Sequence, residues 1–297
     1  MIDRITSSNM VELEKRFFDY NFWSFTKHRT WARCPRQYYF EYIAPYLKPP
    51  APIDVNKIRV LKEYNSRFVL QGQLIHDIIN NQITIHCDKE PMDPTGSYSY
   101  YSRRIAQNKM MAGEIFTEYR HGDRIDLEFF TLIEESGKIC LHNFFENIWP
   151  EYKDRECLRH EEFDKFKIGD VDITVKVDFV SRKKDGTIVL TDWKTGADSD
   201  DYETELQMST YVLWALQYYL KSLKEIESEL IFLKNGEKKQ YSISEQWLNE
   251  VREIIKSEFN EMNASYEYED FPPIPFPREC LSCRYARVCP EARIIRK

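Results

Sequence analysis

The chain has 297 residues, of which 42% are hydrophobic and 31% charged, so it can bury the core of one large domain or two ordinary ones. No stretch approaches the about 20 consecutive apolar residues of a membrane helix, and the N-terminus lacks the apolar segment of a signal peptide, which predicts a cytoplasmic protein without a membrane partner. The formal net charge of −7 argues against nucleic-acid binding, but the basic segments 27–36 and 278–297 could together form one basic surface.

The first half of the chain is predicted to be helical. Apolar residues recur there at helical spacing, and four prolines within residues 45–52 break the pattern. The loop predicted over 91–100 contains two prolines and a glycine. The predicted helices span 9–20, 30–45 and 56–85, and two more within 101–148 divide near 121–123.

At about residue 157 the pattern changes to the alternation typical of strands. Segments 183–186 and 234–237 contain Asp-Gly and Asn-Gly pairs, which favour tight hairpin turns. The predicted strands are 158–168, 171–182, 186–193, 226–233 and 239–244, with helices over 202–222 and 244–268 and an extended arm over 271–277. This order predicts a mixed α/β core that follows a helical insertion.

Three of the seven cysteines cluster near the end of the chain as Cys280-x2-Cys283-x5-Cys289, followed by proline. Thiolates at this spacing suit an iron–sulfur cluster or a zinc ion, and either centre calls for a fourth ligand. Cys34, in the other basic segment, is the best candidate. The remaining cysteines stand in ordinary mixed sequence and are interpreted as small buried hydrophobic residues; they are Cys87, Cys140 and Cys157.

A second constellation lies on the predicted strands. Asp192 and Lys194 are two residues apart at the end of an apolar strand, so they face the same side, and Asp178 lies across the preceding hairpin. Two carboxylates beside an ammonium group make a site for Mg²⁺ or Mn²⁺ with a phosphate, where the lysine orients water or stabilises developing charge. A surface salt bridge is the alternative, but acids among apolar neighbours need a partner or a metal.

Two predicted helices add polar side chains to this constellation. Gln207 and Tyr211 are four residues apart on one helix face, from which both can reach the strand ends. His76 stands in an apolar run of the helix over 56–85, where a neutral imidazole could complete a metal shell. Each of these residues also has an ordinary interpretation as a packed or surface side chain.

Together these residues resemble the RecB-like branch of the PD-(D/E)xK nuclease superfamily, and within it the iron–sulfur members: the CRISPR-associated RecB-like exonucleases and the AddB-type nuclease domains. The motifs that carry the resemblance are, in chain order, Cys34, Gly72-x3-His76, Asp178, Asp192-Trp193-Lys194-Thr195, Gln207-x3-Tyr211 and the three late cysteines. They span residues 34–289, nearly the whole chain. One departure is Val175, where the family often has glycine, and this bulkier side chain would narrow DNA access.

The resemblance implies an α/β, restriction-endonuclease-like fold, in which a mixed β-sheet is flanked by helices, a helical insertion precedes it and an iron–sulfur cluster staples the C-terminal tail. The implied metal ligands are His76, Asp178, Asp192 and the Trp193 backbone carbonyl. The implied catalytic residues are Asp178, Asp192, Lys194, Gln207 and Tyr211, and the implied [4Fe–4S] ligands are Cys34, Cys280, Cys283 and Cys289.

We therefore expect a single nuclease domain over 1–297, with an N-terminal segment (1–50), a helical region (51–150), the nuclease core (151–268) and the cluster segment (269–297). The expected activity is Mg²⁺- or Mn²⁺-dependent DNA hydrolysis, as an exonuclease more than an endonuclease, at single-stranded or frayed ends in repair, recombination or antiviral defence. The alternative is a weakly active or non-catalytic DNA-binding subunit of a helicase or integrase complex, which the acidic net charge favours. A zinc-stapled protein of unrelated function would require the ordered motifs to be coincidence.

Overall fold

The computed structural model describes residues 21–48, 50–123, 125–196 and 201–295. The chain divides into two compact units. One comprises Met1–Tyr64, Lys167–Thr174 and Glu253–Lys297, and the other comprises Asn65–Phe166 and Val175–Arg252. The helix predicted over 9–20 lies outside the described residues.

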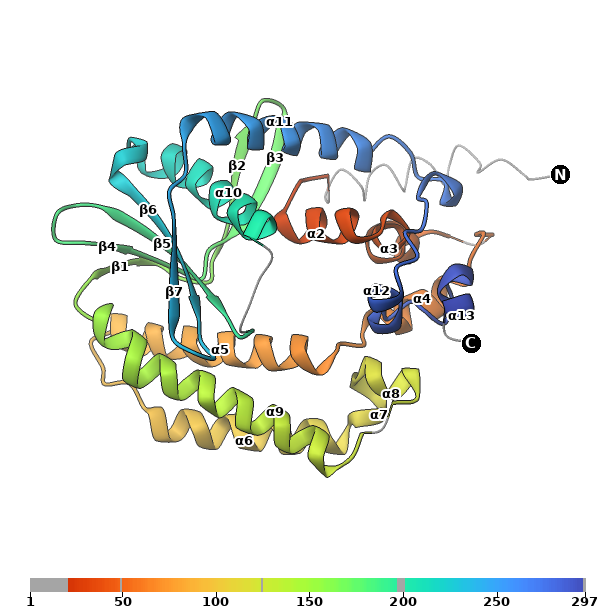
Figure 1. The fold of residues 1–297 in the computed structure, drawn as a ribbon, viewed down its shortest axis with the longest axis horizontal. Helices are drawn as coiled ribbons and strands as arrows, with labels where there is room; N and C mark the ends of the chain where they lie inside the picture. The colour runs from red at the N-terminus through yellow and green to blue at the C-terminus, as the bar shows by residue number, and fades with distance from the viewer. Residues whose placement is uncertain (1–20, 49, 124, 197–200, 296–297) are drawn as a thin grey trace. The chain divides into compact units, whose positions relative to one another are not determined.

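A mixed five-stranded sheet forms the centre of the second unit, with the strand order β1-β4-β5-β6-β7 (Figure 1). Its strands are β1 (Glu156–Arg159), β4 (Phe179–Arg182), β5 (Ile188–Lys194), β6 (Ile226–Phe232) and β7 (Glu237–Tyr241). β5 and β6 run parallel, whereas the other neighbouring strands are antiparallel. The predicted mixed α/β core is thus confirmed.

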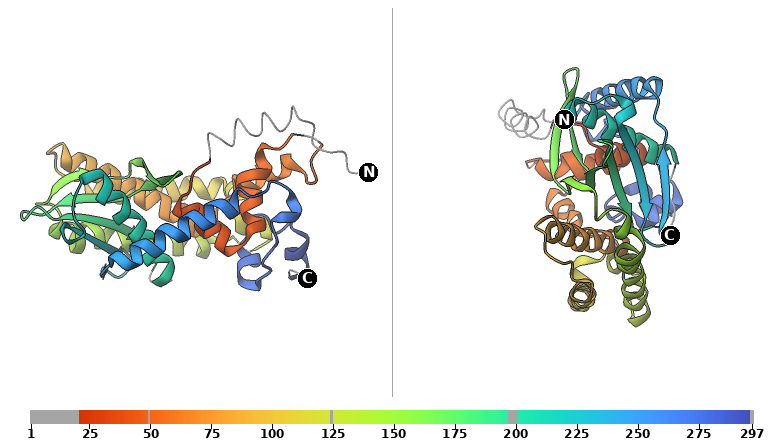
Figure 2. Two further views of the ribbon diagram at one scale, coloured as in Figure 1. Left: turned by 90° about the horizontal axis from the view of Figure 1, so that it is seen from above. Right: turned by 90° about the vertical axis from the view of Figure 1, so that its left-hand side faces the viewer.

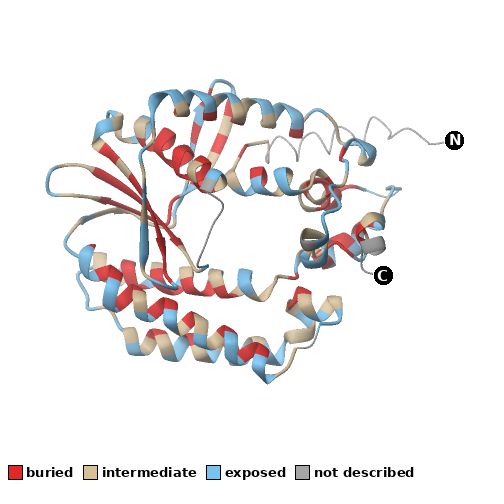
Figure 3. Ribbon diagram, viewed as in Figure 1, coloured by how far each residue is buried: buried red, intermediate tan, exposed pale blue. Residues whose placement is uncertain are grey.

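Helices cover both faces of this sheet. Helices α5 (Arg67–Cys87), α6 (Pro94–Met110) and α9 (Leu127–His142) lie together on one side, and α10 (Asp201–Tyr219) lies on the other (Figures 1 and 2). The strand residues Phe179, Trp193 and Ile231 pack into one core cluster with apolar residues of α5 and α9. The first six residues of β5 are all buried (Figure 3), as expected for a central strand covered on both faces.

The predicted strands over 158–168 and 171–182 are wrong in their continuity, because each is two strands. β1 and β2 (Phe163–Ile168) are separated by a break at Glu161, whose φ of 51° is left-handed. β3 (Val171–Lys176) is likewise separated from β4. β2 and β3 form their own two-stranded sheet, and between them Gly169 takes a φ of 60°, which glycine adopts without strain. The alternation of apolar and polar residues shows only which side chains are buried. It can continue where one strand ends and the next begins in another sheet, so it does not predict the break.

The long helix predicted over 56–85 is also two elements. The chain forms α4 (Val55–Lys62), leaves the helical conformation and starts again with α5 at Arg67. Ser66 ends this interruption, because its side chain accepts a hydrogen bond from the Val69 N–H and so caps α5.

Along the chain after α5, the loop predicted over 91–100 is wrong from Pro94 onward, because α6 begins there. The Asp93 carboxylate accepts a hydrogen bond from the Gly96 N–H at 2.8 Å and so caps the helix. Proline is tolerated in the first turn, because the N–H that it lacks has no partner within a helix at that position. The predicted break near 121–123 is confirmed, because Gly122 has a φ of 82° and ends α8. The short helices before it are α7 (Ala112–Ile115) and α8 (Thr117–His121).

Both predicted hairpin turns are confirmed. The Lys183 N–H donates to the Thr187 carbonyl at 2.9 Å between β4 and β5, and Gly236 takes a φ of 73° between β6 and β7. Helix α10 agrees with the prediction, while α11 (Glu245–Met262) ends earlier than residue 268. Single π- or 3₁₀-helical turns complete the described structure at Tyr39–Ile43, Ala44–Tyr46, Asn143–Ile148, Trp149–Glu151, Leu223–Glu225 and Tyr268–Asp270.

The first unit contains the two segments that carry the predicted cluster cysteines. The single helix predicted over 30–45 is wrong, since α2 (Phe25–Arg33) and α3 (Pro35–Tyr38) are separated at Cys34. Cys34 has an extended backbone (φ −169°, ψ 111°) because the following proline disfavours the helical conformation. Near the other end, the predicted arm leads into α12 (Pro277–Ser282) and then α13 (Pro290–Ile295).

Among the described residues, no helix combines the length and the apolar composition that crossing a membrane requires.

The packing of α6 against α9 depends on Gly137. A Cβ atom at this position would overlap the hydroxyl and ring of Tyr101, which is fully buried and donates to the Ile133 carbonyl at 2.8 Å. We expect Gly137→Ala to lower the free energy of unfolding by about 1–3 kcal/mol, although alanine favours helices by about 1 kcal/mol. Urea denaturation measures this change. Ser136→Ala, which adds no atom at Tyr101, should be neutral or stabilising, and equal effects of the two substitutions would contradict the overlap.

Candidate functional site

Asp178 and Asp192 lie at the same end of two neighbouring strands. β4 and β5 are antiparallel, with Val180 opposite Leu190, so residues 178 and 192 come to the same face. Both side chains are buried, and Asp178 Oδ2 accepts a hydrogen bond from the Trp193 N–H at 2.7 Å. The two acids that the sequence indicated are therefore side by side in the second unit.

Lys194 is held in place by partners from β5 and α10. Its Nζ lies 2.7 Å from Asp192 Oδ2 and donates to Gln207 Oε1 at 2.9 Å. Gln207 Nε2 donates to Asp192 Oδ1 and to the Tyr211 hydroxyl, both at 2.9 Å. The Tyr211 hydroxyl in turn donates to the Lys176 carbonyl at 3.0 Å. The face of α10 that the sequence indicated therefore lies over the strand ends and holds both Asp192 and Lys194.

His76 reaches the carboxylates from α5. Its Nδ1 lies 3.0 Å from Glu161 Oε1 and 3.4 Å from Asp178 Oδ1. Glu161 also pairs with Lys176, and its side chain is 8% exposed. On α5, one turn before His76, Gly72 faces Thr195, the residue after Lys194. The Gly-x3-His spacing thus places one side of α5 against the end of β5.

The acids of this site strongly affect one another's protonation. Burial raises the pKa of Asp178 to about 6; His76 opposes this rise and Asp192 adds to it. Burial also favours a higher pKa for Glu161, but hydrogen bonds from His76 and Lys176 outweigh it and lower the pKa to about 2. For His76, burial lowers the pKa, and the charges and hydrogen bonds of Asp178 and Glu161 raise it well above the usual value. The site therefore concentrates negative charge that cations must balance.

The chemistry of these donors fits a divalent cation. Ligand atoms of His76, Glu161 and Asp178 all lie within 4.8 Å of one another. The carboxylate oxygens of this group suit Mg²⁺ or Mn²⁺, and a cation would relieve the repulsion between the acids. Asp192 is not a member of this group among the described residues, and its oxygens face Lys194 and Gln207 instead. The Trp193 carbonyl stays a predicted ligand.

Glu161 is the residue of this site that sequence reasoning missed. The alternation predicts one continuous strand over 158–168, whereas Glu161 sits in the break between β1 and β2. Its N–H is shared between the Val177 and Asp178 carbonyls at 3.0 and 3.2 Å, which ties it to the start of β4. The adjacent acids Glu161 and Glu162 in an otherwise alternating segment are the one signal that could have indicated it.

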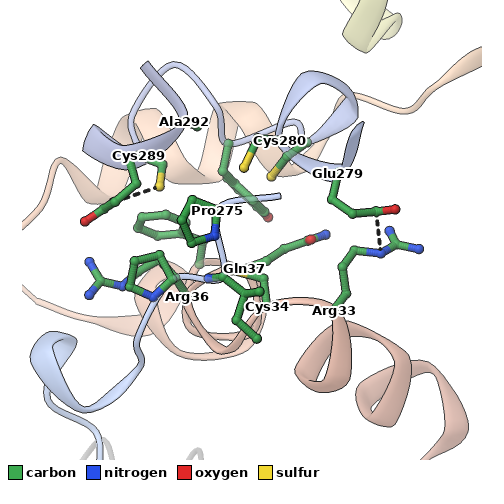
Figure 4. A pocket seen from close by; sticks show the side chains of 15 residues that line it. Arg33, Cys34, Arg36, Gln37, Pro275, Glu279, Cys280, Cys289 and Ala292 are labelled. Atoms are coloured by element: carbon green, nitrogen blue, oxygen red, sulfur yellow. Dashed lines mark hydrogen bonds and ion pairs between the residues drawn. The ribbon is translucent and has the colours of Figure 1, made fainter. Parts of the chain in front are cut away.

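The four predicted cluster cysteines meet in the first unit. Cys34, Cys280, Cys283 and Cys289 line one pocket (Figure 4). Burial raises the pKa of Cys283 to about 12, and the three other thiols contribute to this rise. The Ile274 N–H points at Cys34 Sγ from 3.4 Å. Four soft ligands and an N–H donor to sulfur form a donor set that fits a thiolate-bound cluster.

The basic segments that flank these cysteines also come together, but much of their charge is used inside the unit. Arg33 pairs with Glu279 at 3.0 Å (Figure 4). Arg36 is buried, donates to the Phe271 carbonyl at 2.7 Å and stacks on Tyr268, and Lys27 is buried as well. The expectation of one basic surface is therefore wrong for Lys27 and Arg36, whose side chains are buried in the unit.

Comparison with known proteins gives one assignment. The family model of the PD-(D/E)XK nuclease superfamily matches residues 22–290, which covers both the four cysteines and the carboxylate site. A search of curated proteins found none that matches this chain.

Proposed function

From the premise that the chain belongs to the PD-(D/E)XK nuclease superfamily, we propose that it hydrolyses DNA phosphodiester bonds at single-stranded ends. The superfamily indicates nuclease activity with a divalent metal; the substrate, the direction of attack and the residue roles are our proposal. The observation that carries it is the placement of Lys194, held by Asp192 and Gln207, on the same sheet face as Asp178.

In this proposal Mg²⁺ or Mn²⁺ is held by His76, Glu161 and Asp178, with Asp192 and the Trp193 carbonyl as further ligands. When bound, such an ion polarises a phosphoryl oxygen and offsets the charge of the carboxylates. Metals of this kind prefer oxygen ligands, which Glu161 and Asp178 supply from a buried position.

Lys194 acts on the phosphate itself. Its ammonium group is held between the Asp192 carboxylate, with which it forms an ion pair, and Gln207 Oε1, to which it donates a hydrogen bond. An N–H donor not used by Gln207 is directed at the attacking water or at a phosphate oxygen, where negative charge develops in the transition state. Tyr211 holds Gln207 and the Lys176 carbonyl together, so it acts as a positioning residue.

An exposed aromatic ring beside this site supports a single-stranded substrate. Phe163 is 74% exposed, and the Nζ of Lys176, which pairs with Glu161, lies 5.6 Å from its ring centroid. Unpaired bases stack on exposed aromatic rings without regard to sequence. Phe163 would thus hold a base of the strand whose phosphate reaches the metal.

We expect Phe163→Ala to weaken binding of single-stranded DNA by about 1–3 kcal/mol, the usual value of one stacked base. Phe163→Tyr should retain the affinity, because it keeps the ring. Fluorescence anisotropy with a labelled oligonucleotide, in Ca²⁺ to prevent turnover, measures the dissociation constants. Phe163→Leu serves as the apolar control without a π-face, and equal binding by the Leu and Tyr variants would contradict stacking.

The cysteine pocket supports the finer assignment to the iron–sulfur members of the RecB-like branch. In this proposal a [4Fe–4S] cluster on Cys34, Cys280, Cys283 and Cys289 ties the two ends of the first unit together. Such nucleases fit DNA repair, recombination or antiviral defence, with a helicase or an integrase as partner protein. The aromatic contacts between the segments, such as Tyr38 with Phe271, provide the apolar surroundings.

The test uses the 297-residue protein purified without oxygen. Linear single-stranded DNA labelled at either end, its duplex, a circular single strand and the matching RNA are incubated with Mn²⁺, with Mg²⁺ or with EDTA. We expect metal-dependent shortening of the linear single strand and an intact circle. Cleavage of the circle would overturn the exonuclease assignment, and cleavage of RNA alone would overturn the DNA assignment. A protein inert on every substrate would favour the non-catalytic subunit.

A further inference from the structure

A second group of metal-ligating side chains lies outside the nuclease site. Cys87 is the last residue of α5, Cys157 belongs to β1, and His160 follows β1 directly. Their ligand atoms all lie within 4.8 Å of one another, and each residue is half-buried, so the group can exchange an ion with solvent. The interpretation of the other cysteines as buried hydrophobic residues holds for Cys140, which is fully buried, and is incomplete for Cys87 and Cys157.

One ring nitrogen of His160 has a partner on α5, which fixes the proton on that nitrogen and leaves the other free to act as a ligand. Its Nδ1 lies 2.5 Å from Asn80 Oδ1, an amide oxygen on α5 that can only accept. Nδ1 therefore carries the proton, and Nε2 keeps its lone pair. Metal-binding histidines commonly have this arrangement, in which an acceptor behind the ring fixes the tautomer and directs the other nitrogen at the ion.

We propose that Cys87, Cys157 and His160 bind a thiophilic divalent cation of the Zn²⁺ class. Two thiolates neutralise a divalent ion, so the complex carries no net charge into a half-buried site, and two thiol protons leave when it forms. Three protein ligands leave the fourth tetrahedral position to water. Burial and the neighbouring Cys87 thiol raise the pKa of Cys157, so in the metal-free protein this thiol keeps its proton.

The ion would join the end of α5 to the end of β1. The next residue along the chain is Glu161, which reaches the nuclease site from a left-handed backbone conformation. A cation on His160 would hold this strained turn and so fix where the Glu161 carboxylate points. The ligands of this ion are separate from His76 and Asp178, and the ion would act on the nuclease site only through the position of Glu161.

The experiment measures thiol reactivity residue by residue. The 297-residue protein is treated with EDTA and then freed of the chelator. It is divided into samples with and without Zn²⁺ that contain a phosphine, and one metal-free sample that contains none. Each sample is alkylated for a short time, and peptide mass spectrometry gives the extent of labelling at each cysteine. We expect Zn²⁺ to slow labelling of Cys87 and Cys157 several-fold, and His160→Gln to remove this protection. Cys140, fully buried in the core, should stay unlabelled with or without the ion.

A neighbouring histidine provides the matched control. His86 adjoins Cys87, but its Nε2 bonds the Lys153 carbonyl at 2.9 Å, so His86→Gln should leave the protection unchanged. Equal labelling of both cysteines with and without Zn²⁺ would overturn the proposal. Protection that needs no metal and disappears only on adding the phosphine would identify a disulfide and overturn it too. The readout is independent of cleavage, so it stands or falls separately from the proposed nuclease function.

Discussion

Replacing Lys194 by alanine is expected to lower kcat for cleavage of single-stranded DNA by about 10²–10³-fold, the usual effect of losing one group that stabilises transition-state charge. The Nζ of Lys194 is held at 2.7 Å from Asp192 and 2.9 Å from Gln207, so the donor is in place before the substrate arrives. Its contribution arises as charge develops on the phosphate, and KM should therefore change little. Single-turnover kinetics at saturating Mn²⁺ measures the effect.

The surrounding residues distinguish a catalytic lysine from a merely structural one. Lys183→Ala removes a partly exposed pair with Glu227 on the same sheet and should retain the wild-type rate. Glu161→Gln should raise the Mn²⁺ concentration needed for half-maximal rate, because it weakens one ligand. Lys194→Ala should leave that concentration nearly unchanged. A Lys194→Ala protein that is folded by circular dichroism and cleaves at the wild-type rate would remove Lys194 from the mechanism.

Replacing Cys34 by serine is expected to remove the proposed cluster and loosen both segments that hold it. Cys34 stands at the break between α2 and α3, whereas its partner cysteines come from residues about 250 positions later in the chain. A cluster that joins such distant segments contributes its binding energy to folding. Iron and acid-labile sulfide should be lost together, and hydrogen exchange should accelerate in α2, α12 and α13.

The matched control for this prediction is Cys87→Ser, which leaves the cysteine pocket untouched and should retain iron and sulfide. Strand β5, in the other unit, should keep its slow exchange in both variants, because its core is independent of the cluster. Equal iron loss from the two variants would show that Cys34 is not a ligand. If the protein is colourless and binds one zinc ion per pocket, the proposed centre is a zinc site instead of an iron–sulfur cluster, with the same four cysteines as ligands.

The features predicted correctly from the sequence are those decided by neighbours along the chain. The Asp-Gly and Asn-Gly turns force hairpins because of backbone geometry alone, and the hairpin between β4 and β5 then brings Asp178 near Asp192. The separation of Gln207 from Tyr211 places both on one helix face for the same local reason. Cys34 is predicted as the fourth cysteine ligand because it stands in the other basic segment. Its extended backbone follows from the proline after it.

The features that were missed depend on contacts between distant segments. Glu161 belongs to the site because β1 pairs with β4, which no local pattern encodes, since a broken and a continuous strand can share one alternation. The sequence predicts Lys27 and Arg36 as surface charges, whereas the packing of α2 and α3 buries both side chains. The same holds for Cys87, Cys157 and His160. Cys87 is distant in sequence from the other two, and only the packing of α5 beside β1 brings the three side chains together.

By itself, then, the sequence determined the change from helices to strands, the two hairpins and the shared strand end of Asp178, Asp192 and Lys194, because turn chemistry and side-chain period act over a few residues. Only the tertiary structure decided where strands break, which helix covers which face and which residues join His76. Those choices follow from burying apolar surface across the whole chain, as when Phe179 and Trp193 pack with α5 and α9. Burial of this kind is set by all packed segments together, so it brings Glu161 to His76 without leaving a local motif.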